Sequence, residues 1–219
     1  MTTHPPSPAA PGAARPDGPP GRRAVQAEHT RDEILRSARR LFAQNGYAAT
    51  SLKEIAKAAG VSVQTVYDSV GQKAQLVRRL NDLIDAEANL GPSIAVAMTS
   101  TDAGVVAALP ARLTRLLVEH CGDIVRASVE AARVDPDLHE VAEEGGRRHR
   151  AGNARVAGRL AELGLLRPGL DVAGAAATMA TLSDARVAFM LIDDHGLDLD
   201  GVERWMAETI ARTVLTPGR

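Results

Sequence analysis

The side chains best suited to chemistry in this chain are short hydrogen-bonding groups gathered in one stretch. Gln64, Thr65, Asp68 and Ser69 lie on the outward side of a helical pattern that runs from Val63 to Ser69. Side chains of this size reach base edges when a helix enters the major groove of duplex DNA. A helix this short and polar is poorly suited to a core position. The pattern therefore predicts a DNA-reading helix.

Groups suited to holding phosphate flank the same helix. Lys73 lies in the first turn of a fourth helix that we expect to begin near Gln72. A helix N-terminus presents free N–H groups and a partial positive charge, so a lysine there strengthens phosphate binding. Tyr67, at the end of the reading helix, either donates its hydroxyl to phosphate or is a half-buried packing residue. We predict phosphate contacts from Tyr67 and Lys73.

Two further helices are needed to position these groups. The first opens at Thr30, because Glu33 stands at the spacing of a reciprocal capping box. It ends before Gly46, since glycine readily takes the left-handed conformation of a helix C-cap. Between these boundaries the apolar residues recur at helical spacing. The residues of this stripe are Ile34, Leu35, Ala38, Leu41 and Phe42.

The second helix repeats the pattern, with Ser51 as its cap, Glu54 three residues later and Gly60 at its end. Ser62 then caps the third helix after a turn of only a few residues. Such a turn is too short for antiparallel packing, so the two helices must cross steeply, as helix-turn-helix pairs do.

This stretch resembles the N-terminal domain of the TetR family of bacterial transcriptional repressors. The matching register runs without a gap from Ile34 to Leu76. Many family members carry Phe where this chain has Val70, a position away from the DNA-reading face. The residues that carry the resemblance are Ile34, Leu35, Ala38, Leu41, Phe42, Gly46, Tyr47, Thr50, Ser51, Ile55, Ala56, Ala59, Gly60, Val61, Ser62, Thr65, Tyr67, Lys73 and Leu76.

The resemblance implies that Lys53 and the outward residues of the reading helix face bases, whereas Thr50, Tyr67 and Lys73 hold phosphates. The family uses a lysine at the position of Lys73 on the DNA backbone. Asp68 repels phosphate unless it accepts a hydrogen bond from a cytosine amino group. The expected DNA-binding residues are Thr50, Ser51, Lys53, Val63, Gln64, Thr65, Tyr67, Asp68, Ser69 and Lys73.

Composition and charge place this domain on a larger globular chain. The 219 residues are 45% hydrophobic, which is ample for a core. Residues 22–82 hold eleven basic and six acidic side chains, whereas residues 83–219 hold fourteen and twenty. A basic head on an acidic body is typical of a protein that meets phosphate with one end only. With two Phe, two Tyr and one Trp, the chain lacks the aromatic residues on which single-stranded nucleic acids stack.

Three segments follow from these patterns. Residues 1–28 are rich in Pro, Ala and Gly, so we expect a disordered tail, although its arginines could instead reach a minor groove. Residues 29–75 form the helix-turn-helix domain, and residues 76–219 form a helical effector-binding and dimerisation domain. No alternating strand pattern occurs, so the fold class is all-α with about nine or ten helices. The helices expected after the third are 72–88, 102–120 with a kink at Pro110, 122–134, 136–163, 171–194 and 199–215.

The resemblance implies that the last two long helices pair with their copies in a four-helix dimer interface, although the same residues suit intrachain core. Dimerisation also has an independent argument. One two-turn helix reads too little sequence, whereas two such helices about 34–36 Å apart read a palindrome. The expected interface residues are Ala180, Val187, Met190, Leu191, Trp205, Met206, Ile210 and Val214.

The resemblance further implies a cavity in the body whose occupation by an unknown small-molecule effector alters the spacing of the two heads. Because aromatic residues are scarce, such a cavity would have aliphatic walls with a few polar groups. The candidate effector-binding residues, each of which also suits ordinary core, are Leu116, Leu117, Ser128, Asn153 and Met179.

Signals for other chemistry are weak. His139 and Glu143 stand one helical turn apart with His149 beyond, but the second histidine of a zinc-protease helix is absent. Solvated charges on a long helix are the commoner reason for such a pattern. The single cysteine excludes an intrachain disulfide, and neither a phosphate-binding glycine loop nor a nucleophile elbow occurs. We therefore predict no enzymatic activity, no cofactor and no bound metal.

The N-terminus carries no charged-then-apolar signal pattern, and the apolar stretch 172–192 is interrupted by Asp184 and Arg186. We expect a bacterial cytoplasmic protein without a membrane partner, associated with the nucleoid when it is bound to DNA.

The favoured hypothesis is a homodimeric transcriptional regulator, a repressor that binds a palindromic operator in double-stranded DNA and is released by a small molecule. One alternative is a helical ligand-binding or catalytic body with a vestigial helix-turn-helix. Another is a regulator that works without an effector.

Overall fold

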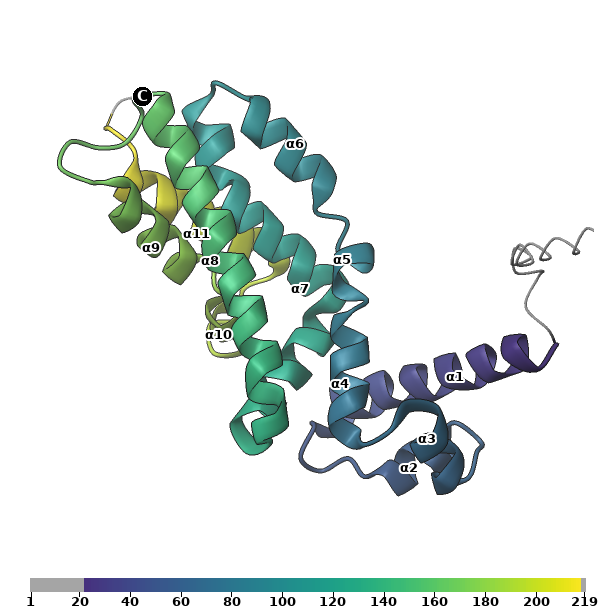
Figure 1. The fold of residues 1–219 in the computed structure, drawn as a ribbon. Coiled ribbons are helices and arrows are strands. Elements are labelled where there is room, and N and C mark those ends of the chain that lie inside the picture. The colour runs from purple at the N-terminus through teal and green to yellow at the C-terminus, as the bar shows by residue number, and fades with distance from the viewer. Residues whose placement is uncertain (1–21, 218–219) are drawn as a thin grey trace, which may run out of the picture.

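The computed structural model describes residues 22–217, and these residues form an all-α molecule with a small head and a larger body (Figure 1). The all-α prediction is confirmed. Within the described range there are eleven α-helices, one 3-10 turn and a single antiparallel bridge between Leu166 and Leu215. The helix-turn-helix lies at one end of the molecule, and α9 and the C-terminus lie toward the other.

The head consists of α1 (Arg22–Asn45), α2 (Leu52–Ala58) and α3 (Val63–Val70). Its core holds Ile34 and Ile55, both fully buried, together with Phe42. Gly46 and Gly60 have φ of +80° and +68°, the left-handed conformation that glycine adopts without a steric cost. The sequence placed both helix ends at these glycines, and the structure agrees.

The start of the first helix was predicted wrongly. α1 begins at Arg22, so residues 22–28 are helical rather than part of the tail. Thr30 lies inside α1, where its hydroxyl donates to the Gln26 carbonyl at 2.9 Å instead of capping the helix. Threonine bonds to the preceding turn in this way, and a capping pattern in sequence cannot exclude that use. The proline-rich segment 1–21, including Arg15, lies outside the described residues.

Three short helices link head and body: α4 (Lys73–Asn81), α5 (Ile84–Glu87) and α6 (Gly91–Thr99). The expected helix 72–88 is therefore divided after Asn81. Sequence analysis expected no helix between residues 88 and 102 and therefore missed α6. Proline in the first turn of a helix removes an N–H that would have no partner there, so it starts this helix instead of ending one.

The body is built on α7 (Ala103–Val134), which merges two expected helices. Its non-helical residue is Cys121 (φ −132°, ψ 15°), and this residue marks the kink. Pro110, where we expected a kink, is buried within α7. The 3-10 turn η1 (Pro136–Leu138) and α8 (His139–Glu162) follow. α8 packs against both α7 and α9.

The C-terminal helices are α9 (Val172–Leu182), α10 (Ala185–Asp193) and α11 (Leu199–Val214). The expected helix 171–194 is broken at Ser183, because Asp184 caps α10 by accepting from the Arg186 N–H at 2.8 Å. The span Val172–Asp193 has a mean hydropathy of 1.3, which is apolar enough for a membrane crossing. Neither of its two helices reaches the roughly 20 residues that a crossing requires.

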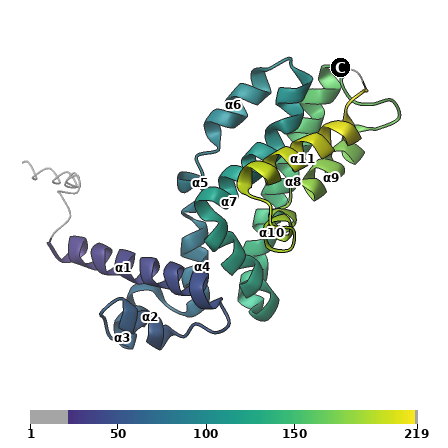
Figure 2. The same cartoon turned by 180° about the vertical axis from the view of Figure 1, so that it is seen from behind.

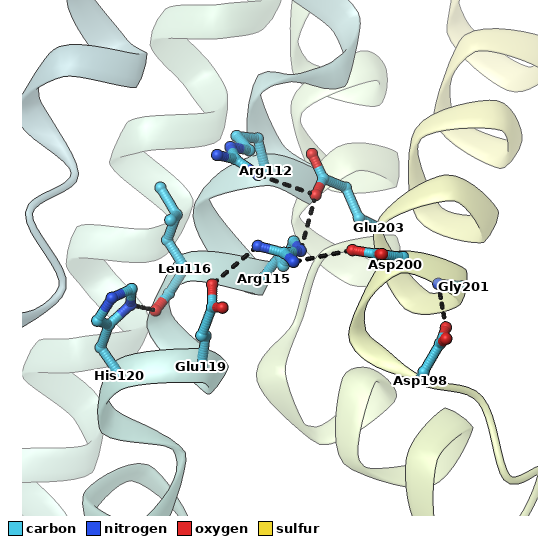
Figure 3. A network of polar contacts seen from close by, with 9 residues as sticks. All are labelled: Arg112, Arg115, Leu116, Glu119, His120, Asp198, Asp200, Gly201 and Glu203. Atoms are coloured by element: carbon cyan, nitrogen blue, oxygen red, sulfur yellow. Dashed lines mark hydrogen bonds and ion pairs between the residues drawn. The ribbon is translucent and has the colours of Figure 1, made fainter.

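A network of ion pairs fixes α11 on α7 (Figure 3). Arg115 of α7 contacts Glu119 at 2.8 Å and, on α11, Asp200 at 2.8 Å and Glu203 at 3.1 Å. Arg112, one turn earlier, contacts Glu203 at 3.2 Å. Figure 2 shows α10 and α11 in front of α7 on one face of the body. The network therefore holds that face to the central helix.

Candidate nucleic-acid interface

The reading helix α3 is held by its apolar side, which leaves its polar side outward. Val66 and Val70 are 0% and 2% exposed, whereas Tyr67, which flanks this side of the helix, is 48% exposed. Ser62 caps the helix, and its hydroxyl accepts from the Thr65 N–H at 3.0 Å. α2 and α3 lie at the end of the molecule remote from α9, α10 and α11 in both views (Figures 1 and 2). α3 is therefore an exposed helix with its polar side facing outward.

The outward polar side chains of α3 bond to one another. The Gln64 amide nitrogen donates to the Asp68 carboxylate at 2.9 Å. The hydroxyls of Ser62 and Thr65 lie 2.8 Å apart. Besides its bond to Asp68, the Gln64 amide has a second N–H and a carbonyl oxygen that a base edge can use. Asp68 is placed to orient Gln64 as well as to meet DNA itself.

α2 packs against α3 and carries exposed lysines. Ser51 and Glu54 form the expected capping box: the Ser51 N–H donates to the Glu54 carboxylate at 2.8 Å, and the Glu54 N–H donates to the Ser51 hydroxyl at 3.3 Å. The bond from the Ser51 N–H, followed by that from its hydroxyl, lowers the pKa of Glu54. Lys53 and Lys57 extend into solvent from this helix.

Thr50 was wrongly assigned as a phosphate contact. Its side chain is buried, at 1% exposure, and its hydroxyl bonds to the Gly46 and Leu41 carbonyls at 2.9 and 3.3 Å. The hydroxyl ties the end of α1 to the start of α2. We withdraw Thr50 from the phosphate contacts, because a buried hydroxyl with two acceptors has no free direction toward DNA.

Lys73 lies at the start of α4, as expected, but its ammonium folds back toward α1. The Nζ atom lies 4.0 Å above the centre of the Tyr47 ring and 3.5 Å from the Ala48 carbonyl. Partial burial lowers the pKa of Lys73, against the opposing effect of Asp135. Its reach to phosphate therefore requires a change of rotamer.

Sequence analysis missed the residues that join head and body. Arg39 of α1 pairs with Glu87 of α5 and Asp123 of α7. Tyr47 donates its hydroxyl to Asp135 at 2.6 Å and its N–H to Glu130 at 3.0 Å. A signal for Arg39 was present, since it stands four residues after Leu35 and three before Phe42, at the edge of the apolar stripe. A charge at that position needs a partner from another helix.

One more contact of the reading helix was missed. Arg31 of α1 donates from Nε to the Ser69 carbonyl at 3.4 Å, near the C-terminal end of α3. Ser69 is half-buried there. The remaining expected base-facing residue, Val63, is 37% exposed in the first turn.

The five candidate effector residues do not meet around one cavity. Leu117 packs against the core that head and α7 share, whereas Met179 is fully buried in the core formed with α8, α9 and α11. The Ser128 hydroxyl accepts from Asn81 at 2.7 Å. The other two, Leu116 and Asn153, are half-buried and buried respectively.

Two grooves of the described residues contain none of those five. One, of about 440 Å³, lies between Arg115 and the start of α11. The other, of about 570 Å³, lies between the end of α1, the second half of α7 and α10, and both phenylalanines line it.

Half of the expected dimer residues are intrachain core. Met206, Ile210 and Val214 are fully buried, and Leu191 is 6% exposed, so a partner subunit cannot touch them without refolding. Helical phase alone cannot tell the core side of α11 from its outer side. The candidates that remain are the exposed residues, Met190 at 47% and Trp205 at 38%, together with the half-buried Ala180 and Val187.

The histidines of α8 do not assemble a metal site in the part of the chain that the structure describes, where no group of three or more potential ligands gathers. His149 instead contacts the Ala180 carbonyl at 2.9 Å, near the break between α9 and α10.

The sequence matches to known proteins cover only part of the chain. Residues 34–80 match the family of bacterial regulatory proteins named after tetR. The HTH-type transcriptional regulator AcrR of Shigella flexneri is 44% identical over 66 residues, 30% of each chain. The HTH-type transcriptional regulator TtgR of Pseudomonas putida is 40% identical over 57 residues, 26% of this chain and 27% of that one. The chain thus matches less than a third of the length of these relatives.

Solved structures resemble the whole fold at low identity. A complex of SmeT with triclosan has a TM-score of 0.66 at 20% identity, covering 87% of this chain and 93% of that one. NalD, the secondary repressor of the MexAB-OprM multidrug efflux pump in Pseudomonas aeruginosa, has a TM-score of 0.66 at 22% identity, covering 87% and 99%. A transcriptional regulator from Saccharomonospora viridis in complex with choline has a TM-score of 0.67 at 19% identity, covering 86% and 98%.

Proposed function

Because the chain belongs, through its N-terminal domain, to the tetR family of bacterial regulatory proteins, we propose that it acts as a homodimeric transcriptional repressor of the bacterial cytoplasm. The family is one of DNA-binding regulators and not of enzymes. The observation that carries the proposal is the outward polar face of α3, supported from beneath by Val66 and Val70. Lys53, Gln64, Thr65 and the other exposed residues of this face are the proposed base contacts.

Phosphate contacts would come from Tyr67 and from Lys73 once its ammonium leaves the Tyr47 ring. The charge distribution supports this orientation, since residues 22–82 carry a basic excess and residues 83–219 an acidic one. The acidic body is repelled by DNA while the head is attracted, so association favours the productive end.

A dimer is part of the proposal because α3 has only eight residues. One such helix contacts few base pairs, whereas two held about 34–36 Å apart read both halves of a palindrome on one face of the duplex. The outer side of α10 and α11, with Met190 and Trp205 exposed, is the proposed interface.

Release by a small-molecule effector is supported by the resemblance to regulators that were solved with triclosan and with choline. An effector-independent regulator is the second candidate. It is favoured by the dispersal of the five candidate effector side chains over separate parts of the core.

A gel-shift assay on the DNA upstream of the protein's own gene tests the proposal. We expect one segment to be retained at moderate salt against an excess of random duplex, with a complex that contains two chains. If no upstream segment is retained above random duplex, the chain is not a repressor of its own promoter and the proposal loses its main support. A thermal-shift screen of small molecules then separates the two candidates, since an effector that prefers one state must stabilise it.

A further inference from the structure

The guanidinium of Arg39 joins three helices at the junction of head and body. From α1 it donates through Nη1 to Glu87 of α5 at 2.7 Å. It also donates two hydrogen bonds to the Asp123 carboxylate of α7, from Nε at 2.5 Å and from Nη2 at 3.0 Å. The hydrogen bond to Asp123 is the main cause that raises the pKa of Arg39. A bidentate pair of this kind fixes direction as well as distance, which a lysine cannot do.

A fourth contact places the same group at the kink of α7. Nη2 donates to the His120 carbonyl at 3.0 Å, and His120 immediately precedes Cys121, the non-helical residue of α7. A side chain that bonds into the carbonyl ladder of a helix is a recognised cause of kinks. Arg39 therefore contacts α7 in its bent form, and a straight helix would present a different carbonyl geometry to it.

Apolar contacts and the hydrogen bonds of Tyr47 also hold the head against α7. The apolar core runs continuously from Ile34 and Ile55 of the head to Ile124 and Ala131 of α7. Apolar contact is non-directional, so it holds the two parts together without specifying one orientation. Tyr47 adds hydrogen bonds to Glu130 and Asp135 farther along α7. Arg39 supplies the directional contact at the other end of this seam.

We propose that Arg39 is a positioning residue that fixes the orientation of the reading head on the body and ties it to the kinked form of α7. Anything that straightens α7 at Cys121, or moves Glu87 with α5, removes a partner of Arg39 and loosens the head. This inference deepens the proposed function, because the spacing of two heads on DNA depends on the orientation of each.

The test measures head orientation directly and uses no DNA. Spin labels are attached at Lys57→Cys on α2 and Arg155→Cys on α8, two exposed positions without an ion pair in the described chain. Cys121 stays in place, since it is fully buried and burial raises the pKa of its thiol to about 11, which suppresses labelling. Dilution with unlabelled protein restricts pulsed EPR to distances within one chain. We expect a single narrow distance distribution in the parent protein.

Arg39→Gln should broaden the distribution and shift its centre. Arg36→Gln is the matched control: it removes the same charge from the same helix, but Arg36 pairs only with Glu33 one turn away on α1. It should leave the distribution unchanged. Asp123→Asn, which keeps the shape of the side chain, should act like Arg39→Gln and add nothing to it in the double variant. If Arg39→Gln does not fold, Asp123→Asn decides alone.

If the distance distribution of Arg39→Gln or of Asp123→Asn superimposes on the distributions of the parent protein and of Arg36→Gln, the inference is wrong. The result stands apart from the proposed function, because an absence of operator binding leaves the EPR distances unaffected. Where an operator is found, Arg39→Gln should weaken binding to the full palindrome by about tenfold or more and leave a half-site nearly unchanged, since only the palindrome needs two aligned heads. Equal losses on both DNAs would contradict a role in positioning.

Discussion

At the scale of single residues, Gln64 is held by Asp68 in the free protein. One N–H of its amide donates to the Asp68 carboxylate, which leaves the second N–H and the carbonyl oxygen for a base edge. A base contact of this kind contributes specificity, since a base with the wrong pattern of donors and acceptors leaves these groups unpaired.

Gln64→Ala should therefore relax sequence preference and leave sequence-independent binding unchanged. We expect operator affinity to fall by about tenfold, in line with the loss of one good base contact, and random-duplex affinity to stay the same. Competition with single-base operator variants measures this change. An unaltered base preference would show that Gln64 does not read sequence.

Lys73→Ala should act in the opposite way, weakening all DNA alike. The loss of one phosphate contact reduces the slope of log affinity against log salt by about one unit. Binding at several salt concentrations, to operator and to random duplex, checks the prediction. If operator binding alone falls, Lys73 serves sequence reading or head structure through its contact with Tyr47, and the phosphate role is wrong.

The face of a helix on which a residue lies could be predicted from the sequence better than the burial and the partners of its side chain. The outward side of α3 was placed correctly because its polar residues alternate with Val66 and Val70 at helical spacing. Thr50 was misplaced because nothing in its own type distinguishes a buried hydroxyl from an exposed one. Arg39 was missed because its partners, Glu87 and Asp123, lie far away in sequence and are brought close only by folding.

At the scale of elements, the caps hold the reading unit in place. Ser51→Ala should destabilise the protein by about 1 kcal/mol at neutral pH, as the loss of a serine N-cap does elsewhere. The pKa of Glu54 is lowered in the folded state. The ionised Glu54 of the capping box therefore contributes to the free energy of unfolding at neutral pH, and this contribution is lost as pH falls through that lowered pKa. The cost of Ser51→Ala should therefore shrink in acid.

Urea unfolding at neutral pH and near pH 3.5 measures both costs, with Ser62→Ala as the control. Ser62 caps α3 through the Thr65 N–H and has no carboxylate partner, so its cost should not change with pH. A pH-independent cost for Ser51→Ala would contradict the role given to Glu54.

Helices that end at a glycine or begin after a capping serine were predicted well in the head, because those residues act locally. The start of α1 and the existence of α6 were not. Residues 22–28 are exposed on every side, so no apolar stripe marks them as helical. The bend of α7 lies at Cys121, where the sequence placed the boundary between helices 102–120 and 122–134, and not at Pro110. The bond from Arg39 to the His120 carbonyl beside this bend was not predictable, because a contact between distant helices leaves no periodic signal.

At the scale of the whole molecule, the account requires two copies. Met190→Asp should weaken self-association at least tenfold, because a carboxylate buried at an interface without a partner costs more than the apolar contact it replaces. Folding should be little affected, since Met190 is 47% exposed in the single chain. Sedimentation equilibrium measures the association, and Trp205, the one tryptophan, reports it by fluorescence.

Val96→Asp, at a position 64% exposed on α6, is the matched control and should leave association unchanged. Equal effects of the two substitutions would show that Met190 lies outside the interface. The sequence predicted a dimer from the size of α3, but it could not tell that Trp205 lies on the outer side of α11 and Met206 on its core side, because both side chains are apolar.

Hydroxyl-radical footprinting of the upstream DNA tests the central claim most directly. Two polar helices held on a dimer should protect two patches on one face of the duplex, with centres about 34–36 Å apart and matching halves of a palindrome. Protection of a single patch, or no protection above that given by random binding, would contradict the account of α3 as one of a pair of reading helices.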